Sequence, residues 1–468
     1  MKHIKANNPS IRLSRAVQRT VMAMACVASM HVCATDAQPA DGYLGRLLFS
    51  DDGEAKTGIK LGGWTQIGAV LKETKGQQGG LGNSPIVLAR DNGIQLNQIY
   101  LYLSKDIRSN IIPRVTPSPA PVFDDYSFGF QVDILYGRDG QPLQTFGWDD
   151  KWDVNAPGNH DPARAGRDRQ DFLVNPQAYI QGYVPWGLGA TFMLGNFMSP
   201  LGNEIGFHFQ PGPNIFYSHT YAFAAAPIKH TGLLVDVNIL KDDAYGLLAG
   251  EFGIVNGWSN FQDNNNQPAY LGGLRYRTPD MATWVDYEFM TGAAQSSMSR
   301  LLVDSRNANV PLTRVMSPRP QNKTQHFLII AHDWNKKWRG QAAYNYGKQK
   351  GDGGSDTIDI LSGAGFKGAT WQGLEARLLY AINEQLSVAA RIEKFQDRDG
   401  FALFPGTAGI RSDFNAVTIG VHWWANKHTL FRPEIRHDWQ SSNNGAKAFN
   451  NGLSDRQTSL NADLLVYF

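Results

Sequence analysis

The sequence predicts an all-β fold: a transmembrane up-and-down antiparallel β-barrel of about sixteen strands. Three observations predict it. The N-terminus reads as an export leader, segments of about ten residues alternate between apolar and polar side chains, and the connections between them are short and long in turn. Strict alternation is the period of a strand, since successive side chains point to opposite faces.

The first residues predict a signal peptide. Residues 2–19 carry five basic and no acidic side chains, and the apolar run that follows, residues 21–33, is too short for a stable membrane anchor. We expect cleavage after Ala34, so that residues 1–34 are removed, 35–57 form a short periplasmic segment and 58–468 form the barrel. A start at Met22 or Met24, and a lipoprotein site at Cys26, are the alternatives.

Removal of this leader changes the charge and the cysteine content. Cys26 and Cys33 are the two cysteines of the chain, so the exported part would contain no disulfide and would need another stabilising device, such as a closed barrel. The loss of five basic residues leaves 44 − 5 = 39 Lys and Arg against 42 Asp and Glu, a balance of −3. No basic surface for nucleic acid is therefore expected.

Candidate strands recur along the chain. In YSFGFQVDILY, aromatic and aliphatic residues from Tyr126 to Tyr136 occupy one face and Gln131 and Asp133 the other. The candidates are 58–71, 95–104, 126–136, 176–184, 189–197, 230–240, 245–255, 268–277, 281–290, 324–334, 337–347, 371–380, 386–395, 414–424, 429–439 and 459–468. The Pro-rich connection 105–125 is too long for a tight turn. Either it contains a short element of its own or a pair of strands has been missed, and fourteen or eighteen strands are the alternatives to sixteen.

The face opposite the apolar stripe carries charges. A dry core would make each buried charge cost several kcal/mol, roughly, even when it is paired, whereas a water-filled lumen would not. We therefore expect a wet interior lined by Glu375, Arg377, Arg391, Glu393, Arg432, Glu434, Arg436, Asp438 and Asp463. The long loop around Glu204 either folds into this lumen as a constriction or projects outward, and Glu204 is its candidate charge.

The aromatic residues and the last strand fit the same fold. Ten tryptophans near strand ends predict interfacial girdles: Trp64, Trp186, Trp258, Trp284, Trp334, Trp338, Trp371, Trp423, Trp424 and Trp439. The chain ends in SLNADLLVYF, an alternating strand that closes the barrel and whose Phe468 resembles the signal read by the barrel-assembly machinery. Pro433, on an outward face, lacks the amide donor that a strand interior requires.

Several stretches resemble the β-barrel porins of the OmpL-like family. They are KLGGWTQIGAV, QLNQIYLYLSKDI, YSFGFQVDILYGRDG, GNFMSPLGNEIG with IKHTGLLVDV, ARIEKFQDRDG and VTIGVHWWANKHTLFRPEIRHDW. The resemblance runs through most of the chain after the leader. It implies an outer-membrane porin of Gram-negative bacteria and no defined substrate.

The expected function is a water-filled channel for passive diffusion of small hydrophilic solutes or ions. The expected partners are those solutes, outer-membrane lipid and the assembly machinery, with homo-oligomerisation left open. No catalytic residue, metal or cofactor is predicted. The sequence has no G-x-S-x-G nucleophile elbow. The stretch GDGGSDTID (351–359) partly matches a Ca²⁺-binding repeat, but such repeats bind calcium as stacked copies and this one occurs once. A plugged structural or adhesive barrel and a barrel hydrolase are the alternatives.

Overall fold

The computed structural model describes most of the chain after residue 56. The described residues are 57–72, 92–111, 117–140, 143–149, 152, 171–202, 204, 214–263, 265–293, 321–351, 353, 367–403, 410–450 and 452–468. The predicted signal peptide, nearly all of the predicted periplasmic segment and most of the 351–359 stretch lie outside them. The protein is almost entirely β-structure, with only the short helical turns η1 (Arg138–Gly140) and α4 (Tyr221–Ala224) in the described part.

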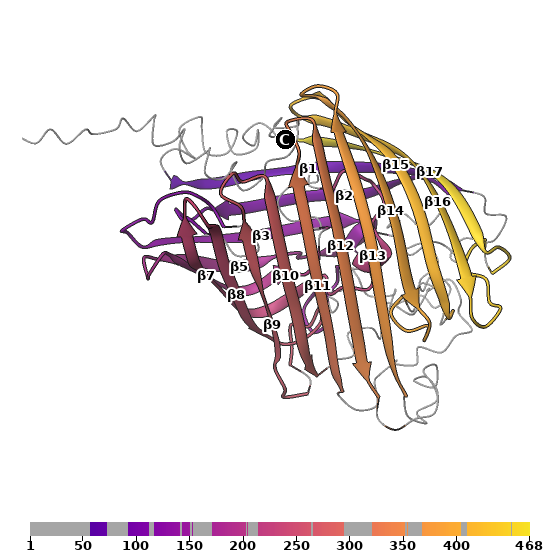
Figure 1. Cartoon of the computed structure of the whole chain (residues 1–468), viewed down its shortest axis with the longest axis horizontal. Helices are drawn as coiled ribbons and strands as arrows, with labels where there is room; N and C mark the ends of the chain where they lie inside the picture. Colours follow the sequence, from indigo (N-terminus) through magenta and orange to yellow (C-terminus); the bar gives the residue numbers. More distant parts are fainter. Residues whose placement is uncertain are drawn as a thin grey trace, which may run out of the picture.

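The strands form one closed antiparallel sheet (Figure 1). They are β1 (Ile59–Lys72), β2 (Gly93–Lys105), β3 (Ser127–Gly137), β4 (Phe172–Val174), β5 (Ala178–Val184), β6 (Ala190–Met198), β7 (Lys229–Asp242), β8 (Gly246–Val255), β9 (Ala269–Arg277), β10 (Thr283–Ala293), β11 (Asn322–Asp333), β12 (Trp338–Lys350), β13 (Gly368–Ala381), β14 (Leu386–Asp397), β15 (Ser412–Asn426), β16 (Thr429–Ser442) and β17 (Arg456–Tyr467).

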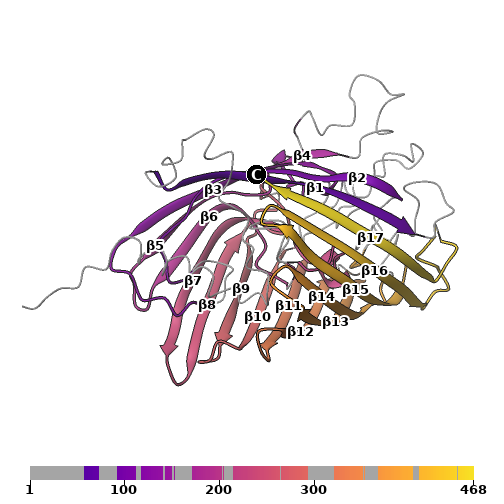
Figure 2. The same ribbon diagram turned by 90° about the horizontal axis from the view of Figure 1, so that it is seen from above.

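The prediction of a sixteen-stranded barrel is confirmed. β4 and β5 both pair with β3, one after the other, and together they make a single interrupted strand of the wall. β17 pairs with β1 and closes the sheet, which Figure 2 shows from above. At the closure Gly63 and Phe468 exchange two backbone hydrogen bonds of 3.0 Å, so the last residue is part of the ladder.

Burial alternates along the strands with the polarity reversed from that of a soluble protein. On β13, Leu374 is 59% exposed, whereas the neighbouring Glu375 is 4% exposed. Apolar side chains thus face outward and charged ones inward, as hydrocarbon outside the wall requires. Among the described residues, no helix is long and apolar enough to cross a bilayer.

The two ends of the barrel differ in their connections. Short turns at 185–189, 243–245, 278–282, 334–337, 382–385 and 427–428 define what we call the short-turn end, and longer loops join the strands at the other, long-loop end. Residues 106–126 lie at the short-turn end and are the exception. Their described parts contain no strand, so the alternative of a missed strand pair is wrong.

Two details of the wall correct or explain the sequence reading. The girdle prediction is wrong for Trp64, Trp258, Trp371 and Trp424, which are buried. Pro433 pairs with Ala462 of β17 on one side. On the other side, the ladder between β15 and β16 pairs Gly420 with Glu434 and next Trp423 with Phe431, so Pro433 has no partner on β15. The missing amide donor of Pro433 therefore coincides with a local gap in the ladder on the β15 side.

Candidate functional site inside the barrel

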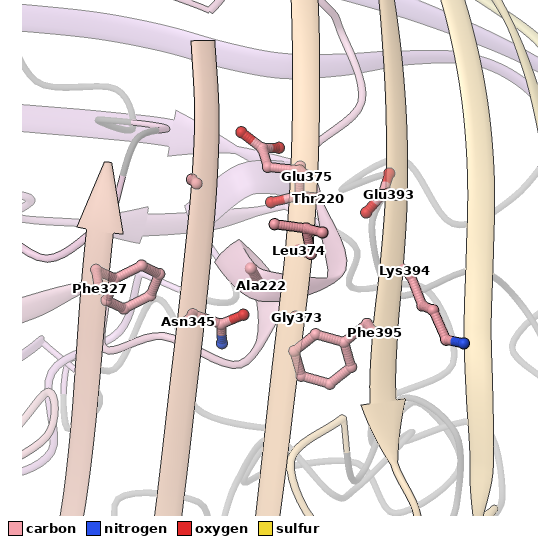
Figure 3. Close-up of a pocket in the computed structure, with 11 residues that line it drawn as sticks. Thr220, Ala222, Phe327, Asn345, Gly373, Leu374, Glu375, Glu393, Lys394 and Phe395 are labelled. Atoms are coloured by element: carbon pink, nitrogen blue, oxygen red, sulfur yellow. The ribbon is translucent and has the colours of Figure 1, made fainter. Parts of the chain in front are cut away.

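The connection between β6 and β7 turns into the barrel instead of projecting from it. We call residues 199–228 the inward segment; 199–202, 204 and 214–228 of it are described. It contains α4, whose N-cap Thr220 accepts a hydrogen bond from Phe223 N at 3.1 Å. Figure 3 shows Thr220 and Ala222 of this segment beside Glu375 and Glu393 of the wall, around a small cavity.

Glu204 joins the inward segment to two arginines of the wall. Its Oε1 atom lies 2.9 Å from Arg391 Nη1 and 3.3 Å from Arg377 Nη2. Its Oε2 atom accepts from Thr220 N at 3.0 Å and lies 2.9 Å from His219 Nδ1. Burial alone raises the pKa of this carboxyl, but the hydrogen bond to His219 and the charges of Arg391 and Arg377 outweigh it and lower the pKa to about 2.

The backbone of the inward segment also bonds to the wall. Ser218 N donates to both carboxylate oxygens of Glu434 at 3.2 Å, and Tyr221 N donates to Glu393 Oε2 at 2.9 Å. Tyr221 Oη donates to Asp438 Oδ1 at 2.9 Å, while Arg391 Nη1 donates to Ser218 O at 3.1 Å. β14 and β16 thus hold this segment through charge-assisted hydrogen bonds, which are stronger than neutral ones.

The remaining predicted charges pair within the wall. Arg436 Nη1 lies 2.7 Å from Glu393 Oε1, and Arg436 Nη2 lies 2.9 Å from Asp438 Oδ1. Arg432 Nε donates to Asp463 Oδ1 at 3.0 Å. These pairs lie on β14, β16 and β17, and their opposite charges neutralise one another inside the barrel.

A second charged group lies across the barrel, on β7 to β10. Arg275 Nη1 is 3.1 Å from Glu251 Oε2 and 3.5 Å from Asp236 Oδ1, and Arg275 Nη2 is 3.6 Å from Glu288 Oε1. Glu288 Oε2 also accepts from Gly202 N at 2.7 Å. The inward segment is therefore bonded to two separate parts of the wall, at β10 and at β13, β14 and β16.

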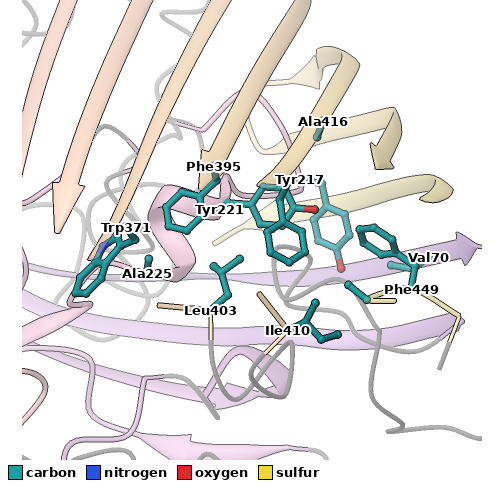
Figure 4. Packing of buried hydrophobic residues seen from close by; sticks show 12 residues of the cluster. Val70, Tyr217, Tyr221, Ala225, Trp371, Phe395, Leu403, Ile410, Ala416 and Phe449 are labelled. Atoms are coloured by element: carbon teal, nitrogen blue, oxygen red, sulfur yellow. The ribbon is translucent and has the colours of Figure 1, made fainter. Parts of the chain in front are cut away.

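Apolar side chains of three connections meet beside α4. Tyr217, Tyr221 and Ala225 of the inward segment pack with Leu403 and Ile410 of the β14–β15 connection (Figure 4). Ala448 and Phe449 of the β16–β17 connection complete this cluster against Phe395 and Phe414 of the wall. Segments distant in sequence thus share one buried core within the long-loop half of the barrel.

The structure places all ten predicted residues on the inside of the barrel. Glu375, Arg391, Glu393, Arg432, Glu434, Arg436, Asp438 and Asp463 are between 0 and 7% exposed, and the Arg377 side chain is 11% exposed. Glu204 lies among them. The inward segment and their mutual ion pairs cover these groups.

The sequence reading missed Arg275 and the polar cluster around Asp139. Asp139 accepts from Asn97 Nδ2 at 3.0 Å and from Gln98 Nε2 at 2.8 Å, and Tyr217 Oη donates to Asn97 Oδ1 at 3.0 Å. The inward position of Arg275 could have been predicted from the sequence, because Arg275 alternates with the outward Leu274 and Tyr276 on β9. No sequence pattern predicts the position of Asp139, since it lies in η1 beyond the end of β3.

Within the described part of the chain, no group of three or more His, Cys, Asp or Glu side chains is arranged to hold a metal ion. The His219–Glu204 pair is accounted for by the contacts of the inward segment.

Comparison with known proteins places the chain in a family. No curated protein matches it. Among solved structures, it is similar to the outer membrane channel DcaP of Acinetobacter baumannii (TM-score 0.49, 10% identity, 88% of this chain and 97% of that one). It is also similar to OmpT of Vibrio cholerae (0.48, 8%, 88% and 98%) and to the anion-selective porin from Comamonas acidovorans (0.48, 9%, 88% and 99%). The family model described as "Putative beta-barrel porin-2, OmpL-like" matches residues 58–468, and the chain belongs to this family of outer-membrane β-barrel porins.

Proposed function

We propose that this barrel is a channel of the bacterial outer membrane through which small hydrophilic solutes or ions diffuse passively. The observation that carries the proposal is the polarity of the wall, apolar outside and charged or hydrogen-bonding inside, on a barrel of sixteen strands. Barrels of this size enclose a lumen wide enough for water. Membership of the porin family supports the same function.

In this proposal the nine wall charges line the passage and Glu204 with the inward segment narrows it. The contacts of Glu204 with Arg377 and Arg391 support this role, because they hold a loop carboxylate across the middle of β13 and β14. Rings and rows of fixed charge at a narrow point set ion preference in channels. Three further points remain predictions: export by the signal peptide, insertion through the strand that ends in Phe468, and homo-oligomerisation.

Planar-bilayer recording of the purified, refolded protein tests the channel. We expect discrete conductance steps, and swelling of liposomes in small sugars but not in large ones. Heat-denatured protein is the control for leaks caused by detergent. Bilayers that stay silent over many insertions, with the barrel shown to be folded by its heat-modifiable mobility, would contradict a channel.

One observation favours a second candidate, a plugged barrel with a structural or adhesive role. The inward segment bonds to β10, β13, β14 and β16 and covers the wall charges. The same recording separates the two candidates, because a plugged barrel conducts only after the segment is shortened. For the hydrolase alternative, the test is calcium-dependent hydrolysis that a single Ser or His substitution abolishes.

A further inference from the structure

The connection between β2 and β3 packs into the short-turn end of the barrel. The structure describes residues 106–111 and 117–126 of this connection, and we call these residues the mouth segment. Every other short-turn connection between wall strands is a tight turn, whereas the mouth segment is far longer and lies close to β5 and β7 (Figure 2). Asn110 is fully buried and Ile111 is 2% exposed, so the segment is packed against the protein.

Its first anchor is Tyr183 of β5. Phe123 N donates to Tyr183 Oη at 3.1 Å, and Tyr183 Oη donates to Phe123 O at 3.2 Å. The two rings also meet edge to face, with centroids 6.1 Å apart. One tyrosine thus satisfies both backbone groups of Phe123, which fixes the position of this part of the segment.

Its second anchor is the turn between β5 and β6. Asn110 Nδ2 donates to Leu188 O at 2.8 Å, and Asn238 Nδ2 of β7 donates to the same oxygen at 3.1 Å. Gly189 has φ +100°, and a Cβ at this position would collide with Asn110 Oδ1. The turn therefore needs glycine both for its backbone conformation and for the approach of Asn110.

Two further contacts extend the arc that the mouth segment spans. Lys241 Nζ of β7 donates to Ala120 O, and Lys60 Nζ of β1 lies 3.0 Å from Asp106 Oδ2. The segment therefore reaches from β1 past β2, β3, β5 and β6 to β7, which is more than a quarter of the sixteen-stranded wall.

The anchoring side chains point into the barrel. Tyr183 shares the inner face of β5 with Tyr179, while Ile180 on the other face is 55% exposed. Lys241 pairs with the buried Leu247 of β8, and directly paired residues on neighbouring strands share a face. A segment held from these inner-face groups lies inside the rim, along the arc from β1 to β7, instead of running outside the barrel.

We propose that the mouth segment is a second constriction, at the short-turn end, in series with the inward segment at mid-barrel. This rests on the proposed channel function and adds a second determinant of the largest solute that passes. Resistances in series add, so widening one of two comparable constrictions raises conductance by at most about two-fold. Both segments then contribute to the size limit.

Shortening the mouth segment tests this directly. Arg108 N donates to Ser127 Oγ at 2.8 Å and Arg108 Nη2 lies 2.8 Å from Asp125 Oδ2, so the two ends of the segment are already close. Replacement of residues 109–124 by a Gly-Gly link should leave the wall intact. We expect conductance up to about two-fold higher and liposome swelling in larger sugars than the wild type admits.

Two milder variants keep the test independent of folding. Tyr183→Phe removes both hydrogen bonds to Phe123 and keeps the ring, and should give a noisier and larger conductance. Pro119→Cys, in a background without Cys26 and Cys33, places a thiol on the exposed part of the segment. A bulky cationic thiol reagent should reduce its conductance, whereas Asp243→Cys, exposed in the β7–β8 turn, is the matched control and should not respond.

The outcomes separate this inference from the channel proposal. A conducting wild type whose conductance is unchanged by shortening and by modification at Pro119→Cys overturns the second constriction and leaves the channel standing. A silent wild type with a conducting shortened variant supports occlusion by the mouth segment and contradicts an open channel. Silence of folded wild type and folded shortened variant overturns both.

Discussion

Glu375 of β13 lies directly opposite Glu393 of β14 in the ladder of the barrel wall. Two residues further along, Arg377 lies opposite Arg391. Like charges placed directly opposite each other destabilise a sheet, so each pair needs opposite charges nearby. Part of this compensation comes from within β13, where Arg377 Nη2 lies 2.6 Å from Glu375 Oε1. Arg377 and Arg391 share the carboxylate of Glu204, which arrives from the inward segment. The inward segment thus supplies a carboxylate that bridges the two opposed arginines of the wall.

We predict that Glu204→Gln loosens the inward segment. Removal of one partner from a buried ion pair leaves the other charge uncompensated and costs about 3–5 kcal/mol. The midpoint of heat-induced unfolding, read as the mobility shift of the barrel on gels, should fall, and proteases should cut within residues 214–220 sooner. Asp243→Asn removes an exposed acidic group from a turn and is the control. Equal midpoints and equal cleavage rates in the two variants would show that Glu204 does not hold the segment.

The same contact should resist acid. Because the pKa of Glu204 is lowered to about 2 in the folded protein, its contribution is fully present above its ordinary value of 4.5 and is lost as the pH falls toward 2. We therefore expect the inward segment to stay protease-resistant at pH 4 and to become susceptible only near pH 2. In Glu204→Gln this acid step should be absent. Release of the segment between pH 4 and 5 in the wild type would contradict the lowered pKa.

The sequence predicts the wall well because its environment is periodic. Lipid contacts every second side chain, so Leu374 and Leu378 on β13 alternate with Glu375 and Arg377 whatever the neighbouring strands contribute. Neighbouring strands can then pair through backbone hydrogen bonds as long as their lengths match. For this reason the strand count and the inward placement of charges can be inferred without any knowledge of pairing partners.

The connections are not predictable in this way. Glu204 and Arg391 are 187 positions apart, and nothing periodic links them. The sequence left open whether the loop around Glu204 folds into the barrel or projects outward. These two positions differ only in tertiary contacts, which no sequence pattern reveals. Trp423 and Trp424 show the same limit at short range. Both are near a strand end, yet the first is 44% exposed and the second is 3% exposed, because adjacent side chains face opposite sides.

A glycine under an aromatic ring gives a further prediction about the wall. Gly347 of β12 pairs with Trp371 of β13, and a Cβ at Gly347 would collide with the indole ring. Trp371 is 2% exposed and cannot move freely, so Gly347→Ala should destabilise the barrel by about 1–3 kcal/mol. Gly250→Ala is the control, since its nearest neighbour is the flexible end of Ile239. A heat-unfolding midpoint for Gly347→Ala as high as that of the control would mean that the ring can shift without cost.

Ion preference should respond to Arg436. Its guanidinium lies 2.7 Å from Glu393 and 2.9 Å from Asp438, so Arg436→Gln leaves two carboxylates with one positive charge fewer. A more negative passage concentrates cations, and the reversal potential in a KCl gradient should shift toward the potassium equilibrium potential. Lys394→Gln removes a positive charge from a half-exposed side chain on the outer face of β14 and is the matched control. If both variants shift the reversal potential equally, or neither does, Arg436 does not border the ion path, and the conducting route lies away from β16.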